Sequence, residues 1–140
     1  MLKKGIYLLL GCCLITSSFA VQVSVLVSFS IPDTLLQETL RECSQLNIPA
    51  YINGLHHDSM SETALKVMAL SKRIPNLNLN IDPTKFERFG IHQVPALVVD
   101  DGKSFDVIYG HLSIKEGLAR MAGRGDVDFT SRQCRRISGE

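Results

Sequence analysis

Strand-like and helix-like stretches alternate along this chain from residue 21 to residue 123. The first stretch, VQVSVLVSFS, has a valine or phenylalanine at every second position, which is the period of a β-strand. Strands are expected within 21–30, 48–54, 76–82, 96–100 and 104–109, and helices within 31–46, 59–75, 83–90 and 113–121. This order builds a parallel sheet with helices on both faces, and the last two strands add an antiparallel hairpin. We therefore predict an α/β fold with a mixed sheet in one domain, residues 21–123.

Apolar residues at helical spacing mark the side of each helix that should face the core. In the first two helices these residues are Leu36, Leu40 and Cys43, followed by Met60, Ala64, Val67 and Met68. We interpret the two methionines as core filling and not as ligands.

Capping residues mark the starts of the helices. The second helix has Ser59 with Glu62, the short third helix has Asp82 before Pro83, and the last helix has Ser113 with Glu116. The first helix permits two arrangements, Thr34 with Gln37 or Ser30 with Asp33, and the sequence does not choose between them.

The segment after Gly123 shows neither period. GRGDVDFTSRQCRRISGE mixes charged and polar residues with single apolar ones. We expect residues 124–140 to form a loosely ordered C-terminal tail.

The first 20 residues have the layout of a secretory signal peptide. Lys3 and Lys4 precede an apolar core at 6–15, and the small residues Ser18 and Ala20 lie three and one positions before a cleavage site. The core is short for a bilayer-spanning helix, so cleavage after Ala20 and export are expected, with no stable membrane insertion afterwards. The alternative is a lipoprotein cleavage box at LLGC, which would leave Cys12 lipidated.

The charge balance of the processed chain is close to zero. Removal of the first 20 residues takes away two of the 15 basic residues and leaves 13 against 14 acidic ones. Such a chain lacks the positive field of a nucleic-acid-binding protein, so that class of partner is not expected.

Two cysteines remain after processing, Cys43 and Cys134. An oxidising compartment favours a disulfide between them. Two separate thiols, one in a helix and one in the tail, are the alternative. The pair is not in a C-x-x-C arrangement, so no redox or metal centre is indicated.

Pro95 stands directly before the apolar run ALVV, which reads as a buried strand. Proline lacks a backbone donor and is confined to the first residue, the edge or a bulge of a strand. The stretch LNIDPTKFERFGIHQVPALVVDDG, followed by GHLSIKEGL, resembles the C-terminal half of a thioredoxin fold. That resemblance implies a cis peptide bond between Val94 and Pro95, in a loop whose backbone pairs with an extended peptide. An ordinary trans proline at a strand start is the alternative.

The redox half of a thioredoxin site is missing. The C-x-x-C motif would lie in the stretch SFSIPDTLL, which contains no cysteine. Thiol chemistry needs a sulfur at the start of the first helix, and Ser28, Ser30 and Thr34 cannot exchange disulfides. We therefore expect a protein that is not an enzyme.

A more specific resemblance covers most of the processed chain. VLVSFSIPDTLLQETL, then NGL, then IDPTKFERFGIHQVPALVV are similar to the F-type conjugative pilus assembly protein TrbC family. The resemblance implies a periplasmic factor of the type IV secretion system that assembles conjugative pili for plasmid transfer, with a TraW-like partner. On the thioredoxin pattern, partner contacts are expected at Phe29, Ser30, Pro32, Val94 and Pro95.

Other chemistry is weakly indicated. HHD at 56–58 is too compact for a metal site without further ligands, and Ser30 lacks the Gly-x-Ser-x-Gly elbow of a hydrolase. We therefore expect no metal and no cofactor. The alternative function is a degenerate thiol-disulfide oxidoreductase or isomerase accessory working through Cys43 or Cys134.

Overall fold

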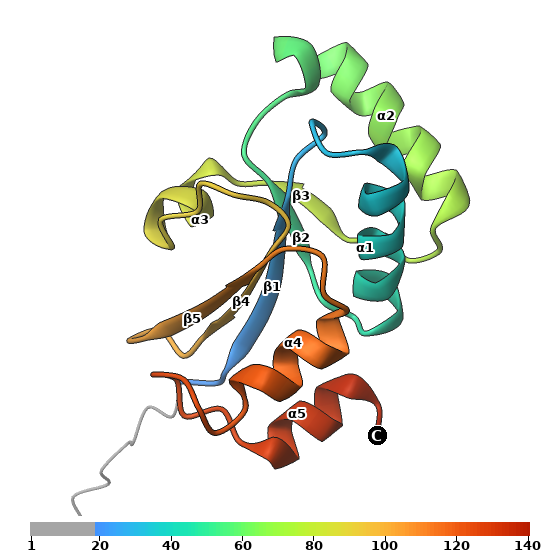
Figure 1. Cartoon of the computed structure of the whole chain (residues 1–140). Coiled ribbons are helices and arrows are strands. Elements are labelled where there is room, and N and C mark those ends of the chain that lie inside the picture. Colours follow the sequence, from blue (N-terminus) through green and yellow to red (C-terminus); the bar gives the residue numbers. More distant parts are fainter. Residues whose placement is uncertain (1–18) are drawn as a thin grey trace, which may run out of the picture.

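A five-stranded sheet runs through the middle of the molecule (Figure 1). The computed structural model describes residues 19–140, so the expected signal peptide and Cys12 lie outside the described residues, apart from Phe19 and Ala20. The strands are β1 (Gln22–Val27), β2 (Ala50–Ile52), β3 (Leu79–Ile81), β4 (Ala96–Asp100) and β5 (Phe105–Tyr109). Their order across the sheet is β3-β2-β1-β4-β5.

The central strand β1 has a parallel neighbour on one side and an antiparallel neighbour on the other. Val25 pairs with Ala50 of β2 and with Leu97 of β4. All five β1 residues from Val23 to Val27 are buried, because both faces of this strand are covered. The mixed sheet with a C-terminal antiparallel hairpin is therefore confirmed.

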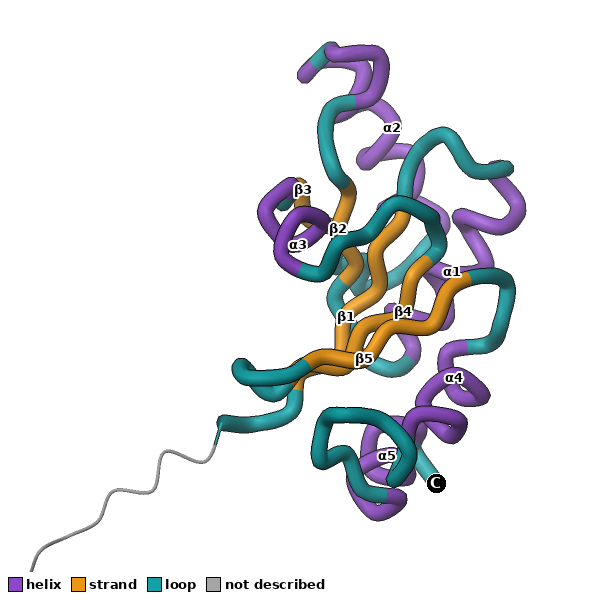
Figure 2. Tube along the Cα trace, turned by 60° about the vertical axis from the view of Figure 1, so that its left-hand side comes forward, coloured by secondary structure: helices purple, strands orange, loops and turns teal. Residues whose placement is uncertain are grey.

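Helices cover the sheet unequally. The helices are α1 (Asp33–Gln45), the 3-10 turn η1 (His56–Asp58), α2 (Met60–Arg73), α3 (Pro83–Arg88), α4 (Ile114–Met121) and α5 (Ser131–Ser138). Figure 2 shows α3 on one side of the sheet and α1, α4 and α5 on the other. The larger core lies on the α1 side, and a smaller cluster around Phe86, Phe89 and Val98 lies under α3.

The expected caps of α2, α3 and α4 are confirmed, and both alternative caps expected for α1 are wrong. The side chains of Ser59, Asp82 and Ser113 accept backbone hydrogen bonds at the starts of α2, α3 and α4. Helix α1 instead begins after Pro32 with no side-chain cap. The Ser30 hydroxyl lies 2.8 Å from the Ser28 hydroxyl, so it bonds within its own loop and leaves the helix start to the backbone.

The two methionines of α2 do not fill the core. The exposed fractions of Met60 and Met68 are 64% and 56%, whereas Thr63 and Leu70 are buried. Apolar residues occupy most positions from 64 to 70, so the sequence carries no clear phase. Tertiary packing therefore selects which side of α2 is buried. That side carries Thr63, whose hydroxyl donates to the Ser59 carbonyl.

The C-terminal segment is folded, contrary to the expectation of a loose tail. Helix α5 begins with a capping box of Thr130 and Gln133. Val127, Phe129 and Cys134 are buried in the larger core. These apolar residues lie partly in a loop and partly in a two-turn helix. Their spacing therefore matches neither the strand period nor the helix period.

An aspartate in the edge strand β5 holds this segment. The carboxylate of Asp106 accepts hydrogen bonds from the amides of Asp126, at 2.9 Å, and Val127, at 3.0 Å. Without these bonds two amides at the edge of the core lose their acceptor.

Asp106→Ala should therefore lower the free energy of unfolding by about 1–3 kcal/mol, measured by urea titration. Asp128→Ala, at an exposed position in the same segment, is the matched control and should change it by less than about 0.5 kcal/mol. Equal effects of the two variants would show that Asp106 does not anchor the segment.

The two cysteines are free thiols in the structure. Both Cys43 and Cys134 are buried in the larger core, and no disulfide joins them within the described residues. From residue 19 onward, the structure has no helix with the length and apolar character needed to cross a bilayer.

Candidate functional site

Pro95 lies directly before the first residue of β4, where the sheet pairing begins. The Val94-Pro95 peptide bond is cis, as expected. Ala96 is the first residue of β4 and pairs with Leu26, near the end of β1. The Pro95 carbonyl accepts a hydrogen bond from the Gly110 amide at 3.0 Å, so the loop is attached to the end of β5. Proline fits here because the ladder starts only after it.

The residues before Pro95 present backbone groups that are not used inside the molecule. Within residues 19–140, no backbone–backbone hydrogen bond engages the amide or carbonyl of His92, Gln93 or Val94. His92 and Gln93 are exposed, and Val94 is half-buried against the cluster under α3. Backbone groups of this kind can pair with an extended chain, as at the edge of a sheet. We call His92–Pro95 the proline loop.

A pocket opens at the carboxyl ends of the parallel strands β1 and β2. It has a volume of about 290 Å³ and is lined by Ser28, Phe29, Ser30, Ile52, Asn53, Gly54, Leu55, His56 and His57. The carboxyl ends of parallel strands are where open α/β sheets usually bind ligands. We call this hollow the strand-end pocket.

Aromatic and charged contacts join the walls of the strand-end pocket. The Phe29 ring meets the His56 ring edge-on, with their centroids 5.4 Å apart. The Lys66 ammonium lies 5.4 Å from the Phe29 ring centroid and 3.2 Å from the Asp33 carboxylate. These contacts link the loop before α1 to helix α2.

The structure divides the expected contact residues into two groups. Phe29 and Ser30 line the strand-end pocket, whereas Val94 and Pro95 lie in the proline loop on the other side of β1. Pro32 is exposed at the start of α1 and lines no pocket described here. Sequence reasoning did not identify the wall formed by residues 53–57, although the NGL motif falls within it.

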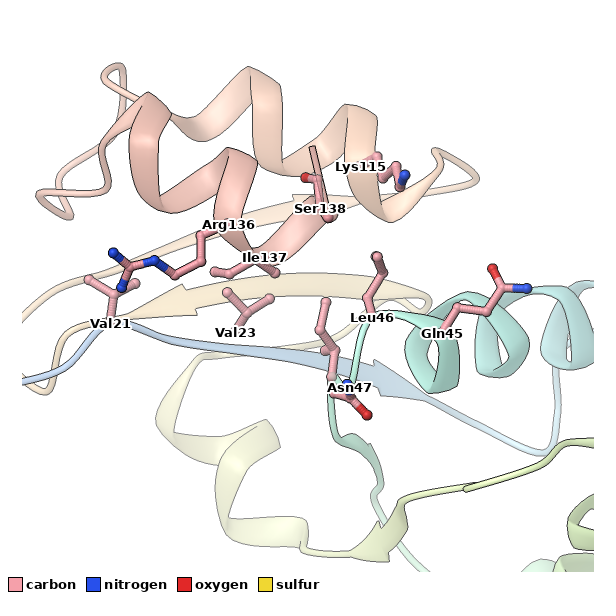
Figure 3. A pocket seen from close by; sticks show the side chains of 11 residues that line it. Val21, Val23, Gln45, Leu46, Asn47, Lys115, Arg136, Ile137 and Ser138 are labelled. Carbon is pink, nitrogen blue, oxygen red and sulfur yellow. The ribbon is translucent and has the colours of Figure 1, made fainter.

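A larger hollow lies at the opposite end of β1. Figure 3 shows Val21 and Val23 on its floor, with Leu46 from the end of α1 and Arg136 and Ile137 from α5 around it. Its volume is about 570 Å³. Two of its lining side chains, Lys115 and Arg136, are basic. It is enclosed by residues from β1, the end of α1 and α5, and the sequence did not predict α5, so it offered no sign of this hollow.

The thiols are placed where they cannot act as nucleophiles. Cys43 is 2% exposed, and burial, followed by the nearby Glu42 carboxylate, raises the pKa of its thiol to about 12. The Cys134 sulfur is also buried and lies 3.9 Å from the Ser138 hydroxyl. Neither cysteine lines the strand-end pocket. Disulfide exchange needs an accessible thiolate, which this arrangement does not provide.

Two solved structures share the fold. The structure described as MTB dsbF in its mixed oxidized and reduced forms has a TM-score of 0.53 and 15% identity, over 85% of this chain and 81% of that one. StoA from Bacillus subtilis has a TM-score of 0.52 and 10% identity, over 73% of this chain and 82% of that one. At these identities the likeness establishes a thioredoxin-like fold and nothing about activity.

Sequence comparison is more specific. A family model described as type-F conjugative transfer system pilin assembly protein matches residues 25–130. Periplasmic protein TrbC of Escherichia coli (strain K12) is 39% identical over 100 residues, which are 71% of this chain and 47% of that protein. The chain thus spans about half the length of this curated relative. The chain belongs to the family of type-F conjugative transfer system pilin assembly proteins.

Proposed function

We propose that this protein is a periplasmic assembly factor of a type IV secretion system, needed to build the conjugative F-type pilus. The observation that carries the proposal is the family match over residues 25–130. This range includes strands β2 to β5 and all of β1 except its first residues. The 39% identical relative is named as a periplasmic protein, which supports the same compartment. A signal peptide at residues 1–20, cleaved on export, would deliver the chain there.

We further propose that the protein works by binding other proteins and not by catalysis. The β1–α1 loop carries serines where a thioredoxin-like enzyme would need cysteines, and Cys43 is buried with a raised pKa. These two observations disfavour the alternative, a degenerate thiol-disulfide oxidoreductase. Without thiol chemistry, the thioredoxin-like scaffold can still serve as a surface that binds other proteins.

The proline loop supports a specific mode of binding. Its unused amides and carbonyls lie beside the start of β4 and can pair with an extended segment of a partner. Phe29 and Ser30, on the other side of β1, can receive side chains of the same partner in the strand-end pocket. A TraW-like protein of the same transfer system is the partner that we propose.

Proline substitutions test this mode, because each removes one backbone donor. Gln93→Pro and Val94→Pro delete amides that have no acceptor within the described residues. At least one of them should weaken binding of the purified TraW-like protein by about 2–10-fold, the range expected for one hydrogen bond. Binding is measured by calorimetry, and circular dichroism checks folding.

The matched controls are Gln93→Ala and Val94→Ala, which truncate the same side chains and keep the amides. Proline variants that bind as their alanine controls do would remove the proline loop from the proposed interface. Reduction of a model disulfide by the wild-type protein would instead restore the enzymatic alternative. Normal pili in a strain lacking the protein would overturn the assembly role itself.

A further inference from the structure

Three side chains that can bind a metal ion converge where the strand-end pocket meets helix α2. Nitrogen atoms of His56 and His57 and a carboxylate oxygen of Glu62 all lie within 4.8 Å of one another. The Nδ1 atom of His57 is 2.6 Å from Glu62 Oε2, and the two imidazole rings stack with centroids 3.8 Å apart. The sequence suggested His56, His57 and Asp58, whereas the structure brings Glu62 of the next element to the two histidines in place of Asp58.

The backbone under these side chains is held in place by the start of α2. The His56 amide donates to the Thr63 hydroxyl at 2.7 Å, and that hydroxyl donates to the Ser59 carbonyl at 2.6 Å. The Ser59 amide in turn donates to the His56 carbonyl at 3.0 Å. Thr63 is 2% exposed, so this network is anchored in the protein and the two histidines sit on a fixed turn.

The turn also has an unusual backbone conformation. His57 and Asp58 have φ angles of 50° and 53°, in the left-handed region that non-glycine residues adopt uncommonly, although His and Asp enter it more readily than most. Residues held in such conformations cluster at ligand-binding sites. An exposed pair of His57 and Glu62 contributes little to stability, so the pair by itself does not explain two consecutive residues of this kind.

We propose that His56, His57 and Glu62 bind one divalent transition-metal ion of the zinc type. Two imidazoles and one carboxylate are a ligand set that Zn²⁺ uses when one position stays open. Tetrahedral coordination needs ligand atoms about 3.3 Å apart, so His57 and Glu62 must separate slightly. The two imidazoles must also turn out of their stack, because each nitrogen lone pair lies in its ring plane and nearly parallel rings cannot both point at one ion. The His57 and Glu62 side chains are 71% and 52% exposed and are free to move.

The open position gives the ion a role at the surface. Both histidines line the strand-end pocket, so a carboxylate or imidazole that enters the pocket can reach the metal. The ion would then join this chain to another by a shared coordination bond. This proposal does not depend on the proline loop or on the identity of the partner in pilus assembly.

Metal titration of the untagged full chain tests the site. Zn²⁺ should bind at one ion per chain in calorimetry, and Co²⁺ should give the visible absorption of a four-coordinate site. His57→Ala and Glu62→Gln should each weaken Zn²⁺ binding by at least about tenfold, and His56→Ala/His57→Ala should abolish it. His92→Ala/His111→Ala removes the other two histidines of the chain, both exposed, and should change the affinity by less than twofold.

The outcomes separate clearly. Loss of binding confined to the first three variants, with unchanged circular dichroism, establishes the site. Absence of stoichiometric binding by the wild-type chain overturns the proposal. Binding that persists in His56→Ala/His57→Ala overturns it as well, because the ion then sits on the cysteines or elsewhere.

Discussion

Replacing Phe129 with alanine is expected to lower the free energy of unfolding by about 3–5 kcal/mol. Phe129 is 1% exposed and packs in the larger core, although it belongs to a segment without any sequence period. Its carbonyl accepts a hydrogen bond from the Gly123 amide at 2.8 Å, which fixes the loop before α5. Loss of the ring leaves a cavity that the surrounding residues fill only in part.

Chemical denaturation of the wild type and the variant measures this difference. Phe105→Ala is the matched control, because Phe105 is 40% exposed in the edge strand and should cost about 1 kcal/mol. A loss below about 1 kcal/mol for Phe129→Ala would mean that the C-terminal segment is dispensable for the domain core.

Stability should fall steeply above pH 9 because of one buried thiol. Burial raises the pKa of Cys43 from 9.0 to about 12 in the folded protein. In the unfolded chain the thiol ionises as pH rises through 9, while the folded protein keeps it protonated. Its contribution to stability is therefore complete below pH 9 and is lost between pH 9 and 12. Between pH 8 and 11 the expected loss is about 2–3 kcal/mol.

Urea titrations at several pH values test this expectation. Cys43→Ala removes the titrating group, so its stability should decline less steeply above pH 9 than that of the wild type. Val99→Ala truncates another fully buried residue of the same core and should shift the whole curve without changing its slope. A Cys43→Ala curve parallel to that of the wild type would show that this thiol is not the cause.

The structure separates a thioredoxin-like scaffold from thioredoxin-like chemistry. The cis proline and the loop after β1 are both present, but that loop carries Ser28, Phe29 and Ser30 in place of cysteines, and the pocket beside it is also lined by His56 and His57. Recognition can use a backbone loop and an aromatic-lined pocket, whereas exchange of disulfides needs an accessible thiolate. Retaining the first without the second is consistent with a family of assembly proteins.

Much of the fold follows from short-range patterns. The valines of β1 and the caps at Ser59, Asp82 and Ser113 all act within a few residues. The same holds for the turn at 101–104 between β4 and β5, where the Asp101 carboxylate accepts hydrogen bonds from the amides of the next residues. A local signal of this kind is readable because period, cap and turn chemistry are properties of neighbouring residues. The sequence thus determined the order of the five strands and of helices α1 to α4, and the mixed sheet.

The sites depended on contacts between distant segments. Glu62 joins His56 and His57 only because η1 folds back onto the first turn of α2. Packing against the core also decided which face of α2 points outward. That face carries Met60 and Met68.

The C-terminal segment is the largest contribution of tertiary structure. Val127, Phe129 and Cys134 have no common period, and all three are buried in the larger core, where α5 packs against α4 and Asp106 of β5 holds the Val127 amide. A strand or helix period in the sequence indicates which residues are buried only where a single regular element packs one face against the core. Where a loop and a short helix meet the core together, packing decides what is buried, and only the folded chain shows it.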